Sequence, residues 1–372
     1  MNWFVKSLHM RNEKEGNCMK YDILFFEALG EENAHIHEAI AESKAAGNLP
    51  ADMTYFVTTE NFQEWRAKNP DVELPNIIST KTHSRLPESW LNEGEKKSLL
   101  SRSAGYDHFE HLANIANVTS LRRYCVNAVA ETAIKLMMCA CGNLNQYTAN
   151  TPSFERNNCV SFKELTGLKV TVFGVGNIGR RIYELCKGMG TDVRAVDVRE
   201  KELSAVYGDE VRFISKEQAI DSDVVICAMN YTAFPESRFY NKSYFTAEYL
   251  SKFPEGLVFV NVTRGEIAPE GELLKVWENG NLFGIGLDVF SGEAGLTKVL
   301  RGEKEPETEN EKAGAFFIRS AIDRTANIYV QPHQAFNSDV AALCKAEETI
   351  RHLEAYYRNG QKCFDSQLPY YL

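Results

Sequence analysis

A glycine-rich turn at residues 170–179 constrains the fold of this 372-residue chain more than any other feature. An apolar strand-like run leads into three spaced glycines, and apolar residues at helical spacing follow them. Gly174 allows a tight turn, Gly176 lets a phosphate approach bare backbone, and Gly179 lets the helix pack closely on the strand. The first helical amides, at Asn177 and Ile178, would face an anion. The pattern therefore predicts a dinucleotide-binding turn.

A carboxylate at the end of the next predicted strand indicates which dinucleotide binds. The run Asp192–Val196 is followed by Asp197, close to the spacing at which a carboxylate accepts hydrogen bonds from the adenosine ribose. Asp197 favours NAD, because its charge would repel the 2′-phosphate of NADP, although the nearby Arg199 leaves room for relaxed NADP use. A βαβ unit without a ligand is the competing interpretation, and the combined context weighs against it.

The rest of the chain alternates strand-like and helix-like runs, which indicates an α/β protein with two domains. In the first hundred residues, the runs 21–28, 53–58 and 77–78 predict a small parallel sheet, with a helix over 31–46. The second pattern is longer and more regular, as expected of a doubly wound parallel sheet. Its strand-like runs are 169–174, 192–197, 223–228, 257–262, 284–289 and 327–331.

Four segments outside this alternation have their own predictions. Strong helix formers and small residues over 127–144 predict a buried helix, and the polar residues 145–161 predict a loop. The charge-rich segment 301–312 predicts a solvated surface loop. Residues 339–357 predict a final helix that packs back onto the first domain through apolar residues at helical spacing, namely Leu343, Ile350, Leu353 and Tyr357.

Reactive side chains follow three successive strands of the second pattern. Arg264 comes just after the run 256–262, Asp288 and Glu293 follow 283–287, and His333 follows 327–330. The carboxyl ends of parallel strands meet at one edge of a sheet, the edge that also holds the glycine turn. We therefore expect these groups to lie beside a bound nicotinamide.

A cation, a carboxylate and an imidazole at this edge suit the reversible oxidation of a 2-hydroxy acid. Arg264 can bind the substrate carboxylate and polarise the C2 oxygen. His333 can exchange the hydroxyl proton, while Glu293 fixes its tautomer and stabilises the protonated ring. Each residue alone has an ordinary structural explanation: a surface ion pair, a loop charge, or a histidine bonded to backbone. Their joint occurrence at sequential strand ends favours the catalytic interpretation.

Composition restricts the remaining function classes. A formal charge of −10 disfavours nucleic-acid and anionic-membrane partners, and no apolar run is long enough to span a membrane. Nine scattered cysteines indicate buried thiols in the cytoplasm, and Trp3–Val5 is too short for a signal-peptide core. We expect no metal site, because candidate ligand pairs lack further ligands at suitable spacing; these pairs are Cys139 with Cys141, His35 with His37, and His108 with His111.

Five motifs give the chain a clear resemblance to the D-isomer-specific 2-hydroxy acid dehydrogenases, most of all to the branch acting on D-lactate and D-2-hydroxyisocaproate. The similarity covers nearly the whole length. The motifs are Ser101–Asp107, Tyr124–Glu131, Asn261–Gly265, Leu287–Glu293 and Pro332–Phe336. The resemblance implies D stereochemistry and a homodimer, neither of which follows from spacing alone.

The same resemblance assigns further site residues. Backbone amides at Ala104 and Gly105 would help bind the substrate carboxylate, and Tyr124 and Phe336 would lie near the substrate side chain. Asp288 would face the nicotinamide carboxamide. The other implied cofactor contacts are Met229, Asn230, Val262 and Thr263.

Some positions depart from the family pattern without touching Arg264, Glu293 or His333. Asn230, Ala294 and Val126 stand where prolines are usual, and Pro269 replaces an aspartate. Pro269 suits the first turn of the helix that follows, because a proline there loses no intrahelical hydrogen bond. The insertion at 301–312 is longer than expected for the branch.

The resulting expectation is an α/β protein in which a Rossmann NAD-binding domain, 125–334, is inserted into a smaller flavodoxin-like substrate domain, 1–124 with 335–372. The expected reaction is reduction by NADH of pyruvate or a branched or aromatic 2-oxo acid, with neither the substrate nor the direction in the cell fixed. A glycerate or phosphoglycerate dehydrogenase is an alternative, because Arg102, Arg122 and Arg123 offer positive charge for a phosphate. A second alternative is an NAD(H)-sensing, corepressor-like protein.

Overall fold

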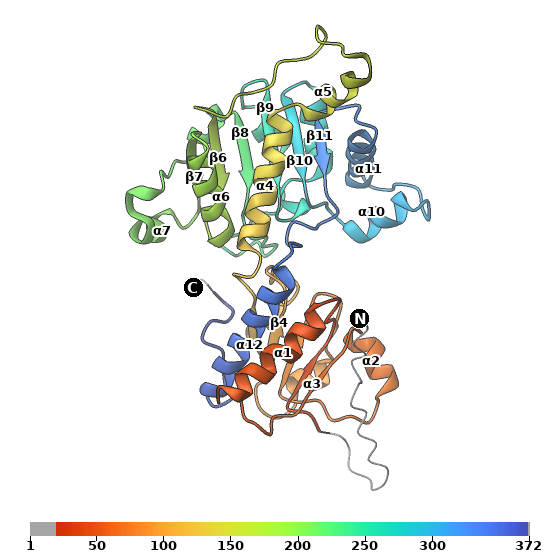
Figure 1. Ribbon diagram of the computed structural model, residues 1–372, viewed down its shortest axis with the longest axis vertical. Helices are drawn as coiled ribbons and strands as arrows, with labels where there is room; N and C mark the ends of the chain where they lie inside the picture. The colour runs from red at the N-terminus through yellow and green to blue at the C-terminus, as the bar shows by residue number, and fades with distance from the viewer. Residues whose placement is uncertain (1–19, 371–372) are drawn as a thin grey trace, which may run out of the picture. The chain divides into compact units, whose positions relative to one another are not determined.

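Residues 20–370 are described by a computed structural model, in which the chain forms two compact α/β units (Figure 1). The first unit contains residues up to Arg102, then Leu112–Thr119 and His352 onward, and the second contains Ser103–His111 and Ser120–Arg351. The predictions for Trp3–Val5 and for one of the nine cysteines, Cys18, lie outside the described residues. None of the helices within 20–370 is long and apolar enough to cross a membrane.

A five-stranded sheet forms the centre of the first unit, with the strand order β2-β1-β3-β4-β5. Strand β1 pairs in parallel with β2 and β3, and β3 pairs in parallel with β4. The parallel direction of these pairs agrees with the predicted small parallel sheet. The strands are β1 (Ile23–Phe25), β2 (Tyr55–Val57), β3 (Ile77–Thr80), β4 (Ser98–Ser101) and β5 (Asn117–Ser120).

The helices of the first unit come from both ends of the chain. They are α1 (Glu32–Ala45), α2 (Phe62–Lys68), α3 (Glu88–Asn92) and the end of α12 (Ala341–Arg358). Glu354 on α12 accepts hydrogen bonds from Ser43 of α1 and from Asn48. Leu353 is buried within the first unit, as predicted. Ile350, which is also buried, and Leu343, which is 43% exposed, lie on the part of α12 that belongs to the second unit.

A buried ion pair holds the carboxyl ends of β1, β3 and β4 together. The Arg102 side chain is fully buried, and its Nε lies 2.8 Å from Oε1 of Glu32. Its other nitrogens donate to Ser79 Oγ and to the carbonyl of Phe26. Lys81 completes the cluster through Glu32 Oε2, at 2.6 Å. Because these partners surround it, Arg102 is a structural residue of the first unit.

The second unit is built on a six-stranded sheet in the order β11-β10-β9-β8-β6-β7. Every pairing is parallel, and a single bridge between Ala195 and Phe213 extends the edge beside β7. The strand order reverses next to β6, where such sheets bind ligands. The strands agree with the predicted runs: β6 (Lys169–Phe173), β7 (Asp192–Val196), β8 (Val224–Cys227), β9 (Leu257–Asn261), β10 (Leu282–Leu287) and β11 (Ile328–Val330).

Helices cover both faces of this sheet (Figure 1). On one face, α4 and α6 contribute to an apolar core with residues of β6, β8 and β9. A second core on the other face involves α8, α9 and α11. The helices are α4 (Val126–Cys141), α5 (Leu144–Asn150), α6 (Asn177–Gly188), α7 (Glu200–Tyr207), α8 (Ala247–Leu250), α9 (Glu270–Glu278), α10 (Glu293–Leu300) and α11 (Glu309–Ile322).

Two segments predicted as loops contain helices. The polar segment 145–161 includes most of α5, whose Asn145 is buried and donates to the carbonyls of Ala326 and Ile328. The charged segment 301–312 includes the first turn of α11, where Thr308 and Glu311 form a capping box. Lys304 also pairs with Glu311. In both places, polar side chains stabilise a helix through specific hydrogen bonds, and apolar periodicity does not reveal them.

The division into units differs in detail from the predicted boundaries at 124/125 and 334/335. Residues Ser103–His111 and the part of α12 before His352 group with the second unit. For example, Glu348 on α12 accepts hydrogen bonds from the backbone amides of Arg122, Arg123 and Tyr124. Independent folding at the predicted boundaries stays a prediction.

Removing the carboxylate of Glu32 should destabilise the first unit strongly, because it leaves Arg102 as an unpaired buried charge. We expect Glu32→Ala to lower the free energy of unfolding of this unit by about 3 to 5 kcal/mol. Urea unfolding followed by the fluorescence of buried Trp65 and Trp90 measures it. The control Glu73→Ala, which breaks the exposed pair with Lys20, should change it by less than about 1 kcal/mol. Equal losses in the two variants would contradict the assignment.

Candidate active site

The predicted dinucleotide turn lies between β6 and α6. Gly174 has φ +84°, and a Cβ there would lie 2.8 Å from the backbone of Met229. A Cβ on Gly179 would lie 1.7 Å from the carbonyl oxygen of Gly174, so helix and strand approach closely. Gly176 is the N-cap of α6, without a side-chain cap, and has open space where its Cβ would be. The turn therefore fits a pyrophosphate at an uncapped helix N-terminus.

Asp197 lies at the end of β7, beside this turn. Its carboxylate accepts hydrogen bonds from the amides of Val175 and Arg199, each at 2.8 Å. Each carboxylate oxygen can accept more than one hydrogen bond, so capacity for ribose hydroxyls remains. The bond to Val175 also fixes Asp197 to the glycine turn. Its role in binding the adenosine ribose stays a prediction.

The other expected cofactor residues follow β8 and β9. Met229 packs against Gly174, and the carbonyl of Asn230 accepts a hydrogen bond from Asn241. Val262 is buried in the core on the α4 face. Thr263 bonds to Asn261 through its amide and its hydroxyl. These residues therefore lie at the carboxyl edge of the sheet, on the β8 and β9 side of the turn.

Asp288 positions the loop that carries His333. It is fully buried, and its carboxylate accepts the amides of Gln334 and Ala335 at 2.9 and 3.1 Å. Its carbonyl accepts the amide of His333 at 2.6 Å. Burial raises the pKa of Asp288 despite these bonds. Three consecutive amides bound to one residue hold His333 at φ +54°, a strained conformation for a residue with a side chain.

His333 and Glu293 form the predicted pair. The ring Nδ1 of His333 lies 3.0 Å from the Glu293 carboxylate, and both side chains are half-buried. Burial raises the pKa of Glu293, but the hydrogen bond and charge of His333, with help from the charge of Arg264, bring it below its ordinary value. Glu293 is therefore a carboxylate at neutral pH. The contact through Nδ1 leaves Nε2 of His333 for another partner.

Arg264 lies against the loop 103–107 within the same unit. Its Nη2 and Nε donate to Asp107 at 2.9 and 3.4 Å, and its Nη1 donates to the carbonyl of Thr263 at 2.8 Å. A Cβ on Gly105 would lie only 2.1 Å from Nη2, so the guanidinium packs directly on the backbone of the loop. Arg264 and Gly105, which the sequence assigned separately to one carboxylate, are thus neighbours. Ala104 packs on the adjacent core.

Two residues of this site were missed by the sequence reasoning. Asp107 is the last residue of the motif 101–107, of which only the backbone amides were assigned a role. Nothing in the spacing of the sequence connected the Asp107 side chain with Arg264. Lys345 is buried on α12, with its ammonium 4.8 Å from the ring centroid of Tyr124 and 5.1 Å from that of Phe336. The two expected aromatic residues therefore contact one cation, an arrangement set by the tertiary structure alone.

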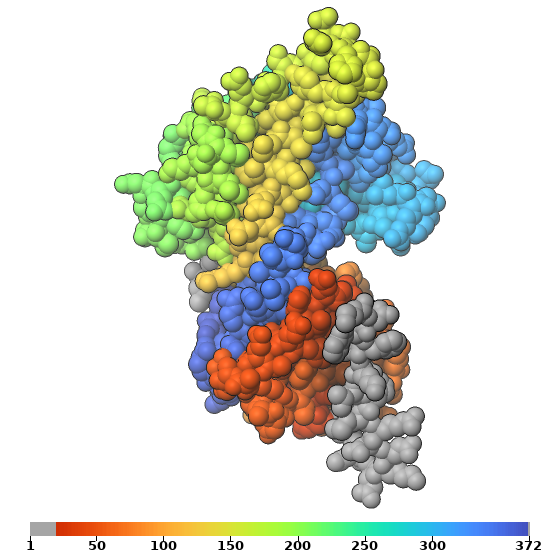
Figure 2. All heavy atoms as spheres, viewed as in Figure 1, coloured from red at the N-terminus to blue at the C-terminus, as the bar shows by residue number. Residues whose placement is uncertain are grey.

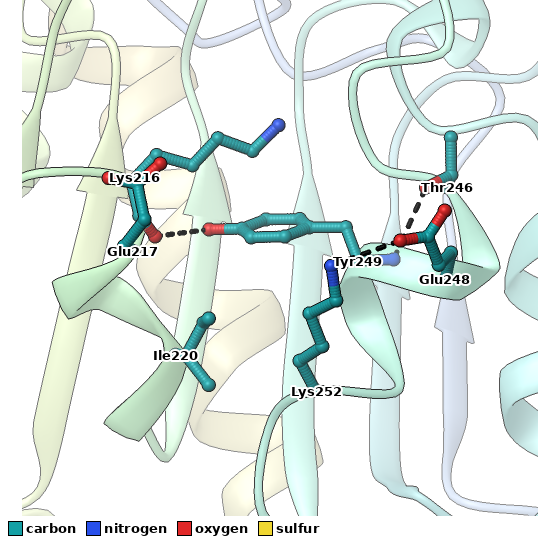
Figure 3. A pocket seen from close by; sticks show the side chains of 7 residues that line it. All are labelled: Lys216, Glu217, Ile220, Thr246, Glu248, Tyr249 and Lys252. Carbon is teal, nitrogen blue, oxygen red and sulfur yellow. Dashed lines mark hydrogen bonds and ion pairs between the residues drawn. The ribbon is translucent and has the colours of Figure 1, made fainter.

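Other potential sites are separate from this edge. A pocket of about 330 Å³ lies where Tyr249 donates to the carbonyl of Lys216, and Figure 3 shows its lining. It contains none of the predicted site residues. Within residues 20–370, no three potential ligands from His, Cys, Asp and Glu gather as a metal site. The eight cysteines in this range are free, four of them buried.

Known proteins with a similar sequence are D-specific dehydrogenases. The chain is 24% identical to a D-lactate dehydrogenase of Lactiplantibacillus plantarum over 343 residues, covering 83% of this chain and 95% of that protein. It is also 24% identical to a D-specific alpha-keto acid dehydrogenase of Enterococcus faecalis over 268 residues, covering 71% of this chain and 77% of the relative.

Solved structures share the fold across nearly the full length. A D-lactate dehydrogenase from Aquifex aeolicus, complexed with NAD and lactic acid, has a TM-score of 0.71 at 21% identity and covers 91% of this chain and 96% of its own. A D-2-hydroxyisocaproate dehydrogenase has a TM-score of 0.68 at 19% identity, covering 92% and 98%. These likenesses confirm the predicted α/β fold.

A family model identifies the second unit. The model for the NAD-binding domain of D-isomer specific 2-hydroxyacid dehydrogenases matches residues 134–335, more than half of the chain. The match contains the glycine turn, Asp197, Arg264, Glu293 and His333, and so agrees with the NAD-binding turn predicted from the sequence. The chain therefore belongs to the D-isomer-specific 2-hydroxyacid dehydrogenases.

Proposed function

We propose that this protein reversibly reduces a 2-oxo acid to the D-2-hydroxy acid with NADH, using His333 as acid and base, Glu293 as its partner and Arg264 for the substrate carboxylate. One observation carries the proposal. The imidazole–carboxylate pair and the guanidinium lie after neighbouring parallel strands, close enough for the charge of Arg264 to lower the pKa of Glu293.

The loop 103–107 and Arg264 would bind the substrate carboxylate together. An arginine carries five N–H groups, and Asp107 and Thr263 engage the guanidinium on all three of its nitrogens without using every N–H. The remaining N–H groups can donate to a carboxylate or to the C2 oxygen. Gly105 packs on Nη2, so the backbone amides at Ala104 and Gly105 would lie beside these donors.

His333 would move the proton of the reaction. With Nδ1 on Glu293, Nε2 can donate a proton to the C2 oxygen during reduction and take it back during oxidation. The negative charge of Glu293 stabilises the protonated ring before that transfer. Asp288 holds the loop, so the imidazole needs little reorganisation.

The cofactor would lie on the glycine turn. Gly174 to Gly179 would hold its pyrophosphate, Asp197 its ribose, and Met229, Asn230, Val262 and Thr263 would line the cleft toward Asp288. Bound NADH supplies the hydride. The open space at Gly176 and the uncapped α6 support this placement.

We propose a small monocarboxylic 2-oxo acid as the substrate, namely pyruvate or a branched or aromatic analogue. Tyr124 and Phe336, with Lys345 between them, would contact its side chain. Of the three arginines on which the phosphoglycerate alternative rests, Arg102 is not available for a phosphate, because its guanidinium is buried and bound to Glu32.

Assembly as a homodimer in the cytoplasm completes the proposal. Large apolar side chains lie exposed on the segment 138–162, part of which is visible in yellow in Figure 2; they are Met138, Leu144, Phe154, Val160 and Phe162. Exposed apolar surface can mark a protein interface, and a second copy of the chain is the proposed partner. We also propose folding domains 125–334 and 1–124 with 335–372.

His333→Ala should lower kcat for 2-oxo acid reduction by about 100- to 10,000-fold, because the proton donor is lost. The assay follows NADH and NADPH oxidation with pyruvate, 2-oxoisocaproate, phenylpyruvate and hydroxypyruvate. His37→Ala, an exposed histidine on α1, is the matched control and should keep its rate. If the unaltered protein oxidises neither NADH nor NADPH with any of these substrates, the proposed enzyme activity is rejected and the corepressor-like alternative is favoured. An unchanged kcat in His333→Ala would reject the assigned role alone.

Asp197→Ala should weaken NADH binding by about 10- to 100-fold, because a charged acceptor of ribose hydroxyls is removed. NADH fluorescence titration gives the Kd, and the kcat at saturating NADH should change little. Asp209→Ala removes an exposed carboxylate nearby in the chain and should leave the Kd unchanged. An Asp197→Ala variant that binds NADH normally would refute the predicted contact.

The combined change Phe154→Ser and Phe162→Ser should shift the protein from dimer to monomer, because it removes two of the exposed apolar side chains from the proposed interface. Sedimentation velocity should give twice the chain mass of 42.0 kDa for the unaltered protein and the single mass for the variant. Val206→Ser, at a 75% exposed position on α7, should remain dimeric. A monomeric unaltered protein would disprove the interface.

A further inference from the structure

Glu270, the first residue of α9, is a buried carboxylate that the proposed reaction does not use. Its side chain is 1% exposed, and its Oε1 accepts the backbone amide of Ser291 at 2.8 Å. Burial raises the pKa of Glu270 to about 7, and the charge of Glu266 adds to the effect. Pro269, which stands where the family pattern has an aspartate, is the N-cap of α9 and directly precedes Glu270.

Glu270 belongs to a set of three carboxylates that bind three consecutive amides. Phe290 donates to Glu293 at 3.3 Å, Ser291 to Glu270 at 2.8 Å, and Gly292 to Glu266 at 3.2 Å. Glu293 is the partner of His333. The other two carboxylates come from the segment 264–270, which begins with Arg264. The turn 290–293 is thus tied to that segment by two hydrogen bonds.

The two segments are also in direct backbone contact. A Cβ on Gly265 would lie 2.0 Å from the amide nitrogen of Ser291 and 2.1 Å from the carbonyl carbon of Phe290. Only a residue without a side chain permits this approach. Gly265 directly follows Arg264 in the chain. The turn that carries Glu293 therefore fixes the backbone position from which the Arg264 side chain extends.

Ser291 also acts on Glu270 through its side chain. Both residues are buried, and a hydrogen bond from the Ser291 side chain lowers the pKa of Glu270 against the larger, opposite effect of burial. Glu270 is therefore held by the backbone amide and the side chain of one residue, at the junction of the two proposed catalytic segments.

We propose that Glu270 is a positioning residue that keeps Arg264 and Glu293 in fixed places relative to each other by clamping the turn 290–293 onto the segment 264–270. The proposal rests on the proposed function. It makes the length of the Glu270 side chain, and its acceptor atom, more important than its charge. Glutamine keeps both the length and an acceptor for the amide of Ser291, whereas aspartate keeps the charge but is one methylene shorter.

The test compares Glu270→Gln with Glu270→Asp in the full-length protein. We expect Glu270→Asp to lower kcat about 10- to 100-fold, because small displacements of reacting groups have effects of this size. Glu270→Gln should keep kcat within about threefold, and the Kd for NADH should be unchanged in both. Glu278→Gln, on the exposed end of α9, is the control and should behave like the unaltered protein. A larger loss in Glu270→Gln than in Glu270→Asp would overturn the proposal.

A double-mutant cycle separates positioning from simple stabilisation. In a Glu293→Gln background, where the His333 partner is already weakened, we expect Glu270→Asp to lower kcat by less than about threefold. The same fold loss in both backgrounds would show that Glu270 acts independently of Glu293, and would overturn the proposal. Thermal unfolding of each variant identifies any that fails to fold. If Glu270→Asp does not fold, the kcat of Glu270→Gln is compared in the unaltered and the Glu293→Gln backgrounds instead. An unimpaired Glu270→Gln supports the proposal, and an impaired one overturns it.

The outcomes distinguish this proposal from the proposed function. An unaltered protein that turns over no 2-oxo acid overturns both. Turnover that depends on Arg264 and His333 but is insensitive to Glu270→Asp leaves the proposed function in place and overturns the positioning role alone.

Discussion

The parallel register of one six-stranded sheet is the constraint on which the rest of the site depends. Because β6, β8, β9, β10 and β11 all run in the same direction, their carboxyl ends lie at one edge. The glycine turn, Arg264, the Asp288–Glu293 segment and His333 each follow one of these strands. Residues more than 150 positions apart in sequence are thereby placed at one edge without a long connecting loop.

Paired charges then fix the orientation of each group at this edge. Arg264 lies against Asp107, and His333 lies against Glu293. Asp288 and Glu270 act differently, since each is buried and binds backbone amides of the loop beside it. Carboxylates thus hold both the side chains proposed to react and the backbone that carries them. Such preorganisation is what polar catalysis requires.

The success of prediction followed the kind of signal in each segment. All six strands of the second sheet were found, because each is a short run in which apolar residues predominate and at least one is buried. β4 and β5 in the first unit were missed, since Ser98–Ser101 and Asn117–Ser120 each contain polar residues that the fold buries. α5 and the start of α11 were missed for a related reason: hydrogen bonds and a capping box stabilise them, and apolar periodicity does not.

By itself, the sequence determined the succession of strands along the chain, the glycine turn and the residues that follow each strand. All of these are local patterns. It could also place Glu293 and His333 at one edge, since parallel strands share their carboxyl side. Only the tertiary structure decided which side chains meet: Asp107 with Arg264, Lys345 with Tyr124 and Phe336, Glu270 with the turn at Ser291, and Arg102 with Glu32. These contacts join segments distant in sequence, and their geometry depends on packing, which no local pattern encodes.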